Sequence, residues 1–83
     1  MKVLYFAWVR QKTGIGSEDV SPPEDVRTAG ELLAWLRQRS DGHAEALADP
    51  ASLRVAVDQQ HADPDTDITK ASEVAFFPPV TGG

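Results

Sequence analysis

Residues 28–37 read Thr-Ala-Gly-Glu-Leu-Leu-Ala-Trp-Leu-Arg, and this stretch decides the fold. Thr28 and Glu31 have the spacing of a capping box, in which the threonine hydroxyl accepts from the third helical N–H and the glutamate reaches back to the N–H of the cap. Leucines then recur at helical spacing and form one apolar stripe, namely Leu32, Leu33 and Leu36. The pattern predicts one main helix over residues 28–39, with Gly42 supplying a left-handed cap at its end.

Segments typical of strands lie on both sides of this helix. Residues 2–10 are rich in Val, Tyr, Phe and Trp and contain neither Gly nor Pro, so they predict a first strand. A glycine-containing turn at residues 14–17 would join it to a second strand at residues 18–21. Residues 53–58 alternate as expected for a strand with one wet face, and Glu73–Phe77 are predicted as the last strand, which two prolines stop.

The order of these elements predicts an α+β fold. It runs strand, strand, helix, strand, short elements that include a possible helix at residues 43–48, and a last strand. This order favours a mixed sheet of four to five strands packed on one side of the main helix. The first and last strands would lie centrally and parallel, as in the β-grasp, or ubiquitin-like, roll. We expect a single domain over residues 1–79 and an extended, flexible tail over residues 80–83.

The composition narrows the class of protein. The chain has 83 residues, of which 41% are hydrophobic and 25% charged, as is usual for a globular domain. It contains no Cys, which excludes disulfides and cysteine-based nucleophiles or metal sites. A net charge of -5 argues against nucleic acid and favours a basic partner surface. No apolar run approaches the ~20 residues of a membrane span and no signal-peptide pattern opens the sequence, so we expect a cytoplasmic protein without a membrane partner.

Candidate metal and catalytic motifs in the chain are weak. Aspartates within residues 63–67 have the spacing of a calcium loop, but Ile68 stands where that loop needs Gly and Val74 where it needs Glu. His43 and His61 have no cysteine partners, so we expect no metal site. The chain is short and has no evident catalytic constellation, so we expect neither a bound cofactor nor an autonomous active site.

The printed sequence closes with Pro78-Pro79, Val80-Thr81 and Gly82-Gly83. Fully extended, residues 80–83 would reach about 13–14 Å. Glycine has no side chain, so such a tail can enter a narrow channel and adopt any backbone torsion. The chemistry that suits it is chemistry at the Gly83 carboxylate, which would react with ATP to give an acyl-adenylate and then accept a nucleophile.

Residues 73–83, Glu-Val-Ala-Phe-Phe-Pro-Pro-Val-Thr-Gly-Gly, resemble the C-terminus of the small subunit of molybdopterin synthase, the MoaD family of sulfur carriers. Residues 3–7 with Arg10 are similar to that family's first strand, and the capped helix and residues 55–59 fall where the family has its helix and third strand. Thiamin-pathway carriers share the fold and the Gly-Gly end. They do not usually carry Phe-Phe-Pro-Pro-Val-Thr before it, which favours the molybdopterin family.

The resemblance implies a reaction cycle at Gly83. An adenylating enzyme would activate the carboxylate with ATP, and a sulfur donor would convert it to a thiocarboxylate. The tail residues Val80, Thr81 and Gly82 would then insert into the large catalytic subunit of molybdopterin synthase, where the sulfur attacks the pyranopterin precursor of the molybdenum cofactor. In that family two carriers flank a dimer of large subunits. The alternatives are sulfur supply to another pathway, such as thiamin, and a ubiquitin-like module that conjugates to lysines or only docks.

Alternation along the predicted strands indicates an apolar docking surface at the base of the tail. Val74 and Phe76 are expected on the core side of the last strand and Phe77 on the other side. On the first strand, the charged residues Lys2 and Arg10 lie at the two ends of one face, so this face is expected to point towards solvent. The apolar residues between them on the same face would then be exposed. The predicted hot spot therefore has four members: Leu4, Phe6, Trp8 and Phe77. The resemblance implies that the positions of Phe6, Arg10 and Phe77 belong to the family's interface.

The sequence departs from the family pattern at three places. His61 stands where the family usually has an apolar interface residue, so docking would be weaker or pH-dependent. Asp58 stands where Asn is common, and Lys70-Ala71-Ser72 replaces a usual Asp-Gly-Asp turn.

Overall fold

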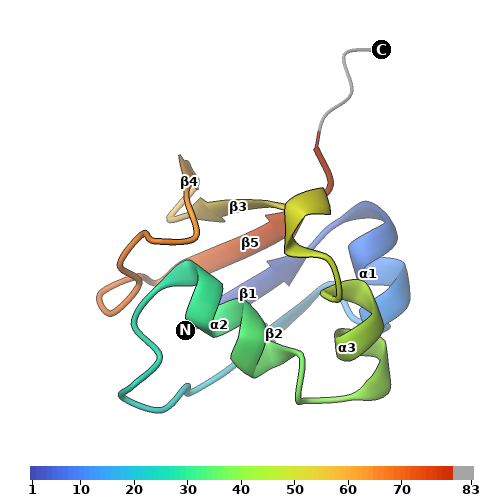
Figure 1. Ribbon diagram of the computed structural model, residues 1–83, viewed down its shortest axis with the longest axis horizontal. Helices are drawn as coiled ribbons and strands as arrows, with labels where there is room; N and C mark the ends of the chain where they lie inside the picture. Colours follow the sequence, from blue (N-terminus) through green and yellow to red (C-terminus); the bar gives the residue numbers. More distant parts are fainter. Residues whose placement is uncertain (80–83) are drawn as a thin grey trace.

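The computed structural model describes residues 1–79 (Figure 1). The predicted tail at residues 80–83 lies outside the described residues and stays a prediction. None of the described helices is long and apolar enough to cross a membrane. The elements follow in this order: β1 (Lys2–Tyr5), α1 (Ala7–Thr13), β2 (Ser17–Asp19), α2 (Ala29–Leu36), α3 (Asp41–Ala46), a 3-10 turn (Pro50–Ser52), β3 (Arg54–Val57), β4 (Gln60–Ala62) and β5 (Glu73–Phe77).

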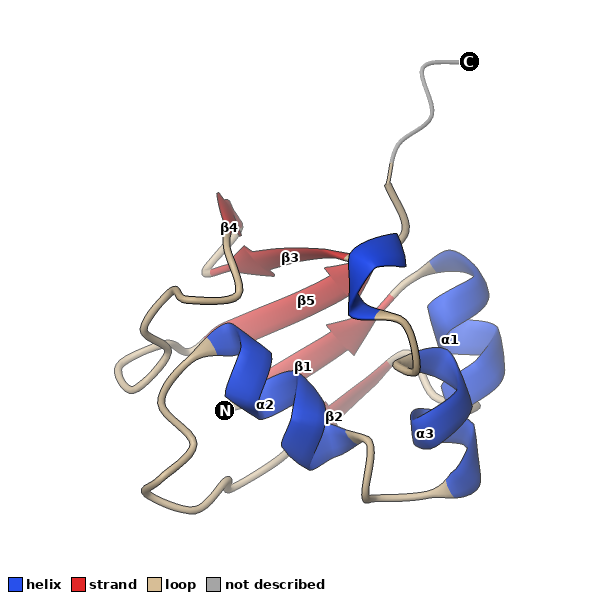
Figure 2. Ribbon diagram, viewed as in Figure 1, coloured by secondary structure: helices blue, strands red, loops and turns tan. Residues whose placement is uncertain are grey.

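The strands form one mixed sheet in the order β2-β1-β5-β3-β4. β1 and β5 run parallel at its centre, with Val3 opposite Val74 and Tyr5 opposite Phe76, whereas the other neighbours are antiparallel. Figure 2 shows α2 across one face of this sheet. The predicted α+β fold of the β-grasp type, with the first and last strands central and parallel, is confirmed.

The core lies between α2 and the sheet. Val3 and Tyr5 of β1 and Val74 and Phe76 of β5 are buried, and they meet the leucine stripe of α2. The capping box begins α2 as predicted, since Glu31 N–H donates to Thr28 Oγ1 and Thr28 N–H donates to the Glu31 carboxylate. Phe77 is only partly buried, so the prediction that it points away from the core is confirmed.

The prediction of a first strand over residues 2–10 is wrong. The strand ends at Tyr5, and α1 covers Ala7–Thr13 and is followed by Gly14, a left-handed C-cap with φ 83°. Phe6 is still extended, but Ala7 has φ 54°, which reverses the chain. Val9 becomes fully buried in the core through this turn. The many Val, Trp and Phe residues resemble a strand in composition, but the backbone leaves the sheet.

The predicted cap at Gly42 is also wrong. α2 ends at Leu36, and Ser40 caps the next helix, because Ser40 Oγ accepts from His43 N–H at 3.1 Å. Gly42 lies inside α3, where a Cβ atom would collide with the backbone carbonyl oxygen of Lys12 in α1. This glycine therefore permits the close approach of two helices. The helix predicted at residues 43–48 exists, but it starts two residues earlier and ends two earlier, as Asp41–Ala46.

Candidate docking face

The face of the sheet turned away from α2 holds a shallow apolar hollow with a volume of about 480 Å³. We call its lining residues the docking face: Leu4, Phe6, Ala7, Ala56, Gln59, Glu73, Ala75, Phe77 and Pro78. Strands β1, β3 and β5 supply most of them, and the small side chains of Ala56 and Ala75 keep its middle low. Because Phe77 and Pro78 close β5, the hollow lies at the base of the segment that leads to Gly83.

Phe6 is the most exposed large apolar residue of this face. It is 48% exposed, and its N–H donates to the Phe76 carbonyl oxygen at 3.2 Å, so the backbone that carries it is tied to the centre of the sheet. Phe6 is continuous with the other apolar residues of the docking face, and a contiguous exposed apolar patch is typical of an interaction site. The Phe6 side chain is therefore exposed to solvent at a defined place beside the end of β5.

His61 joins the same face from the edge strand β4. It lies opposite Ala56 in the β3–β4 register, and its ring is 5.9 Å from that of Phe77 at an interplanar angle of 65°. Four of the residues predicted for the interface are thus brought together: Leu4, Phe6, His61 and Phe77. Their role in binding stays a prediction.

Trp8 and Arg10 do not join them. Both lie on α1, which has turned away from the sheet, and neither lines the hollow. Trp8 packs against the core, and the Lys12 ammonium lies 5.5 Å from the centre of its ring. Arg10 is exposed, with its side chain beside Gly16. The prediction that Trp8 shares an exposed strand face with Leu4 and Phe6 is therefore wrong.

The sequence analysis did not assign six of the lining residues to the interface: Ala7, Ala56, Gln59, Glu73, Ala75 and Pro78. Alternation along residues 53–58 and 73–77 places Ala56 and Ala75 on the outer side of the sheet, but small side chains give no signal of a binding surface. Gln59 has φ 70° and Asp58 has φ 49°, so these two residues make the tight turn from β3 to β4. That turn brings His61 back over the sheet.

Asp58 ties this turn to the start of β5. One carboxylate oxygen accepts from Ser72 N–H at 2.9 Å and from Glu73 N–H at 3.0 Å, and Asp58 N–H donates to the Glu73 carbonyl oxygen. An amide oxygen could accept the same two bonds. The departure at Asp58 and the altered turn at residues 70–72 are therefore compatible with the fold.

A buried polar cluster lies at the core side of the β2 edge. Glu18 accepts from the Tyr5 hydroxyl at 2.7 Å and from Arg39 Nε at 2.9 Å, and its carboxylate is 2.6 Å from Nε2 of the buried His43. Burial opposes charge on Glu18, but the hydrogen bonds from His43 and Tyr5 and the charge of Arg39 outweigh it and hold the pKa of this carboxyl below its usual range. Burial, followed by the bond to Glu18, raises the pKa of Tyr5. Because every member is paired, the cluster serves the fold.

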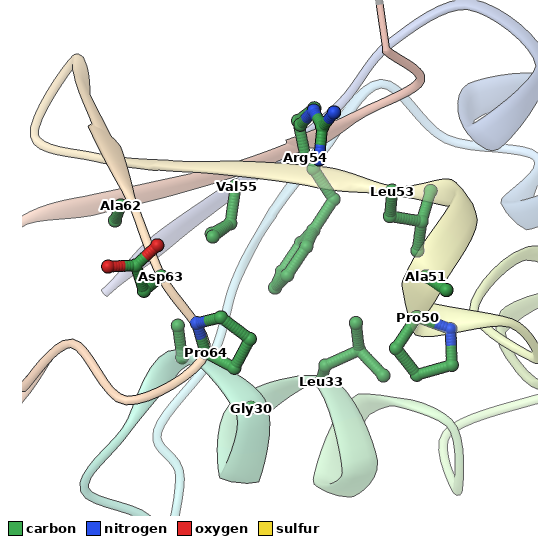
Figure 3. A pocket seen from close by; sticks show the side chains of 12 residues that line it. Gly30, Leu33, Pro50, Ala51, Leu53, Arg54, Val55, Ala62, Asp63 and Pro64 are labelled. Atoms are coloured by element: carbon green, nitrogen blue, oxygen red, sulfur yellow. The ribbon is translucent and has the colours of Figure 1, made fainter.

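A second cavity, of about 310 Å³, lies between α2 and β3 (Figure 3). Leu33, Val55 and Pro64 give it apolar walls, and Figure 3 shows the Arg54 guanidinium turned away from it. Within residues 1–79, no group of three or more His, Cys, Asp or Glu could hold a metal ion. In the acidic loop, Asp67 accepts from the Thr69 hydroxyl and N–H, at 2.6 and 2.7 Å.

Comparison with known proteins agrees with this fold. The sequence pattern of the ThiS family matches residues 3–83. This chain belongs to the ThiS family. It is 42% identical to the molybdopterin synthase sulfur carrier subunit of Escherichia coli strain K12, and the match covers 100% of this chain and 99% of that protein. The protein of the same name from Haemophilus influenzae is 35% identical with the same coverage.

A solved structure from Pyrococcus furiosus, assigned to molybdopterin converting factor, subunit 1, is also similar. The TM-score is 0.76 at 26% identity, and the match covers 95% of both chains. The resemblance to the MoaD family of sulfur carriers, which the sequence indicated, is therefore confirmed for this ThiS-family chain.

Proposed function

We propose that this ThiS-family chain is the sulfur-carrier subunit of molybdopterin synthase and supplies sulfur for molybdenum cofactor biosynthesis. The observation that carries the proposal is its full-length similarity to two molybdopterin synthase sulfur carrier subunits, at 42% and 35% identity. The docking face supports it, because an apolar surface at the end of β5 suits a protein that delivers the residues after Pro78 to a partner.

The chemistry resides in the Gly83 carboxylate. In the proposed cycle this carboxylate attacks ATP within an adenylating partner and releases pyrophosphate, which gives an acyl-adenylate. Sulfur at the oxidation level of sulfide then displaces AMP and leaves a thiocarboxylate. The thiocarboxylate sulfur forms a bond to a carbon of the pyranopterin precursor, from which an oxygen leaving group departs. Water then cleaves the acyl–sulfur bond of the resulting thioester, which leaves the sulfur on the precursor and restores the carboxylate of Gly83. ATP is consumed by the partner, so the carrier itself needs no bound cofactor.

The partner that accepts the sulfur is the large catalytic subunit. Val80, Thr81 and Gly82 would enter its active site while the docking face holds the body of the carrier, with two carriers on a dimer of large subunits. The net charge of -5 favours basic surfaces on both this partner and the adenylating enzyme. Because the activation step consumes ATP, we place the cycle in the cytoplasm.

Intact mass spectrometry tests the carrier chemistry. The chain is incubated with the adenylating enzyme, ATP and a sulfur source, and we expect one oxygen of Gly83 to be replaced by sulfur. A variant without Gly83 is the matched control, which should stay unmodified and still bind the large subunit. An unmodified wild-type chain, beside a known carrier that is modified in parallel, would contradict the proposal.

The same experiment separates the alternatives. Adding the large subunit and the pyranopterin precursor should produce the dithiolene and return the carboxylate. A thiocarboxylate that transfers no sulfur to this precursor would instead indicate a carrier for another pathway. Adducts linked to lysine side chains would indicate a ubiquitin-like modifier.

A further inference from the structure

The docking face carries a titratable side chain at its edge. His61 is exposed on β4, and its ring reaches Phe77 of β5 across the intervening strand β3. This reach is possible because Ala56, the residue of β3 opposite His61, is small. The imidazole therefore lies along the rim of the apolar hollow, edge to face with one of its two phenylalanines.

The charged groups around His61 come from each neighbouring strand. Arg54 of β3 lies opposite Phe77, one outward position along from Ala56. Glu73 lines the hollow at the other end of β5, opposite Lys2 of β1. Asp63 follows β4, and the Asp58 carboxylate is occupied by two backbone N–H groups. Arg54 and Asp63, which carry opposite charges, are thus the charged residues nearest to His61 along β3 and the end of β4.

A partner that covers this face removes water from the rim. A neutral imidazole can be covered beside Phe77 at little cost, because its ring packs as an aromatic. An imidazolium in the same place loses its hydration, and burial of an unpaired charge is costly. Docking therefore discriminates between the two protonation states of His61.

We propose that His61 sets the pH range in which the carrier docks: the complex with the large subunit forms with a neutral His61, and protonation of His61 weakens it. The inference rests on the proposed function, because it requires the large subunit to cover the docking face. The large subunit would then offer an apolar or uncharged surface, without a carboxylate, opposite His61.

Calorimetric titration of the full chain with the large subunit from the same source tests this proposal. Histidine ordinarily changes charge near pH 6.5, so the affinity should fall by up to about tenfold between about pH 7.5 and about pH 5.5. His61→Gln, a neutral substitute, should bind with little change over this range. His61→Lys, a permanent cation, should bind weakly throughout.

The matched control is Gln60→Lys. Gln60 precedes His61 on the same strand, is exposed, and faces the other side because side chains alternate along a strand. Its affinity should follow that of the wild-type chain at each pH. Titrating groups of the large subunit affect every variant alike, so the difference between wild type and His61→Gln isolates His61.

Three results would overturn the proposal: an equal pH dependence in His61→Gln and wild type, a tighter complex at acid pH, or full affinity in His61→Lys. A large subunit that binds no variant at any pH would instead remove the proposed partner. The sulfur-loading experiment does not involve the large subunit, so it would still report on the carrier chemistry.

Discussion

Phe76 and Phe77 are adjacent in the sequence and have opposite environments. Phe76 is 1% exposed inside the core, whereas Phe77 lies on the docking face beside His61. Successive side chains of a strand point to opposite sides, so one residue can support the fold while the next serves a partner. Truncation of Phe77 should therefore affect binding more than stability.

Phe77→Ala should weaken the complex with the large subunit by about 1–3 kcal/mol, the usual range for an aromatic anchor at the centre of an interface. The measurement is the dissociation constant at neutral pH, with unfolding in urea as a check on stability. Ile15→Ala is the control, because Ile15 is also exposed but does not line the hollow. Equal losses in both variants would show that Phe77 is no anchor.

Single residues also show where sequence analysis succeeds and fails. The orientation of Phe77 follows from strand alternation, which is a strong local signal. The turn at Ala7 does not, because alanine seldom adopts a φ of 54° and nothing in its neighbours indicates it. Trp8 and Arg10 were misplaced for that reason. Burial of Val9, which is a property of the whole core, holds the unusual backbone in place.

At the scale of elements, α1 and α3 meet through a glycine. Gly42 on α3 faces the carbonyl oxygen of Lys12 on α1, with no room for a Cβ atom. A second link, the ion pair between Lys12 and Glu45 at 3.7 Å, lies in water and contributes little. Close backbone packing therefore fixes α1, and α1 in turn begins directly after Phe6 of the docking face.

Gly42→Ala should lower the free energy of unfolding by about 1–3 kcal/mol, as overpacking in a close contact usually does. Urea unfolding measures the loss. Gly16→Ala is a suitable control, because its added Cβ atom would meet the Arg10 side chain, which can move away. A Gly42→Ala variant as stable as Gly16→Ala would mean that the two helices separate easily.

Some helices and strands can be predicted from their own sequence better than others. The capping box of α2 is a local signal, and the structure follows it at both Thr28 and Glu31. β4 covers only Gln60–Ala62, and its turn lacks the Asn-Gly or Asp-Gly pair that predicts a hairpin. A strand this short exists because it pairs with β3, so its partner rather than its own residues determines it.

At the scale of the whole molecule, the two histidines lie on opposite sides of the sheet, one in the folded core and one on the docking face. His43 is buried on the core side against Glu18, and His61 is exposed on the docking side against Phe77. The cluster around Glu18 joins β1, β2 and α3 through Tyr5 and His43, and it also holds Arg39, which follows α2. We therefore expect acid pH to weaken docking through His61 and to lower the stability of the fold through the Glu18 cluster. Because the groups differ, the two effects can be measured separately.

The folding effect belongs to Glu18. Its pKa is lowered in the folded chain, so its contribution to stability is fully present above its ordinary pKa of 4.5 and is lost as pH falls through the lowered value. Glu18→Gln should reduce the free energy of unfolding at neutral pH and lessen its decline in acid below about pH 4.5. Glu31 and Asp67, whose pKa values are also lowered by hydrogen bonds, would remain in both proteins and cancel in the difference. Urea unfolding across this range, with the exposed Glu45→Gln as control, measures it. Parallel pH curves for Glu18→Gln and wild type would show that the cluster holds the fold together without any contribution from the charge of Glu18.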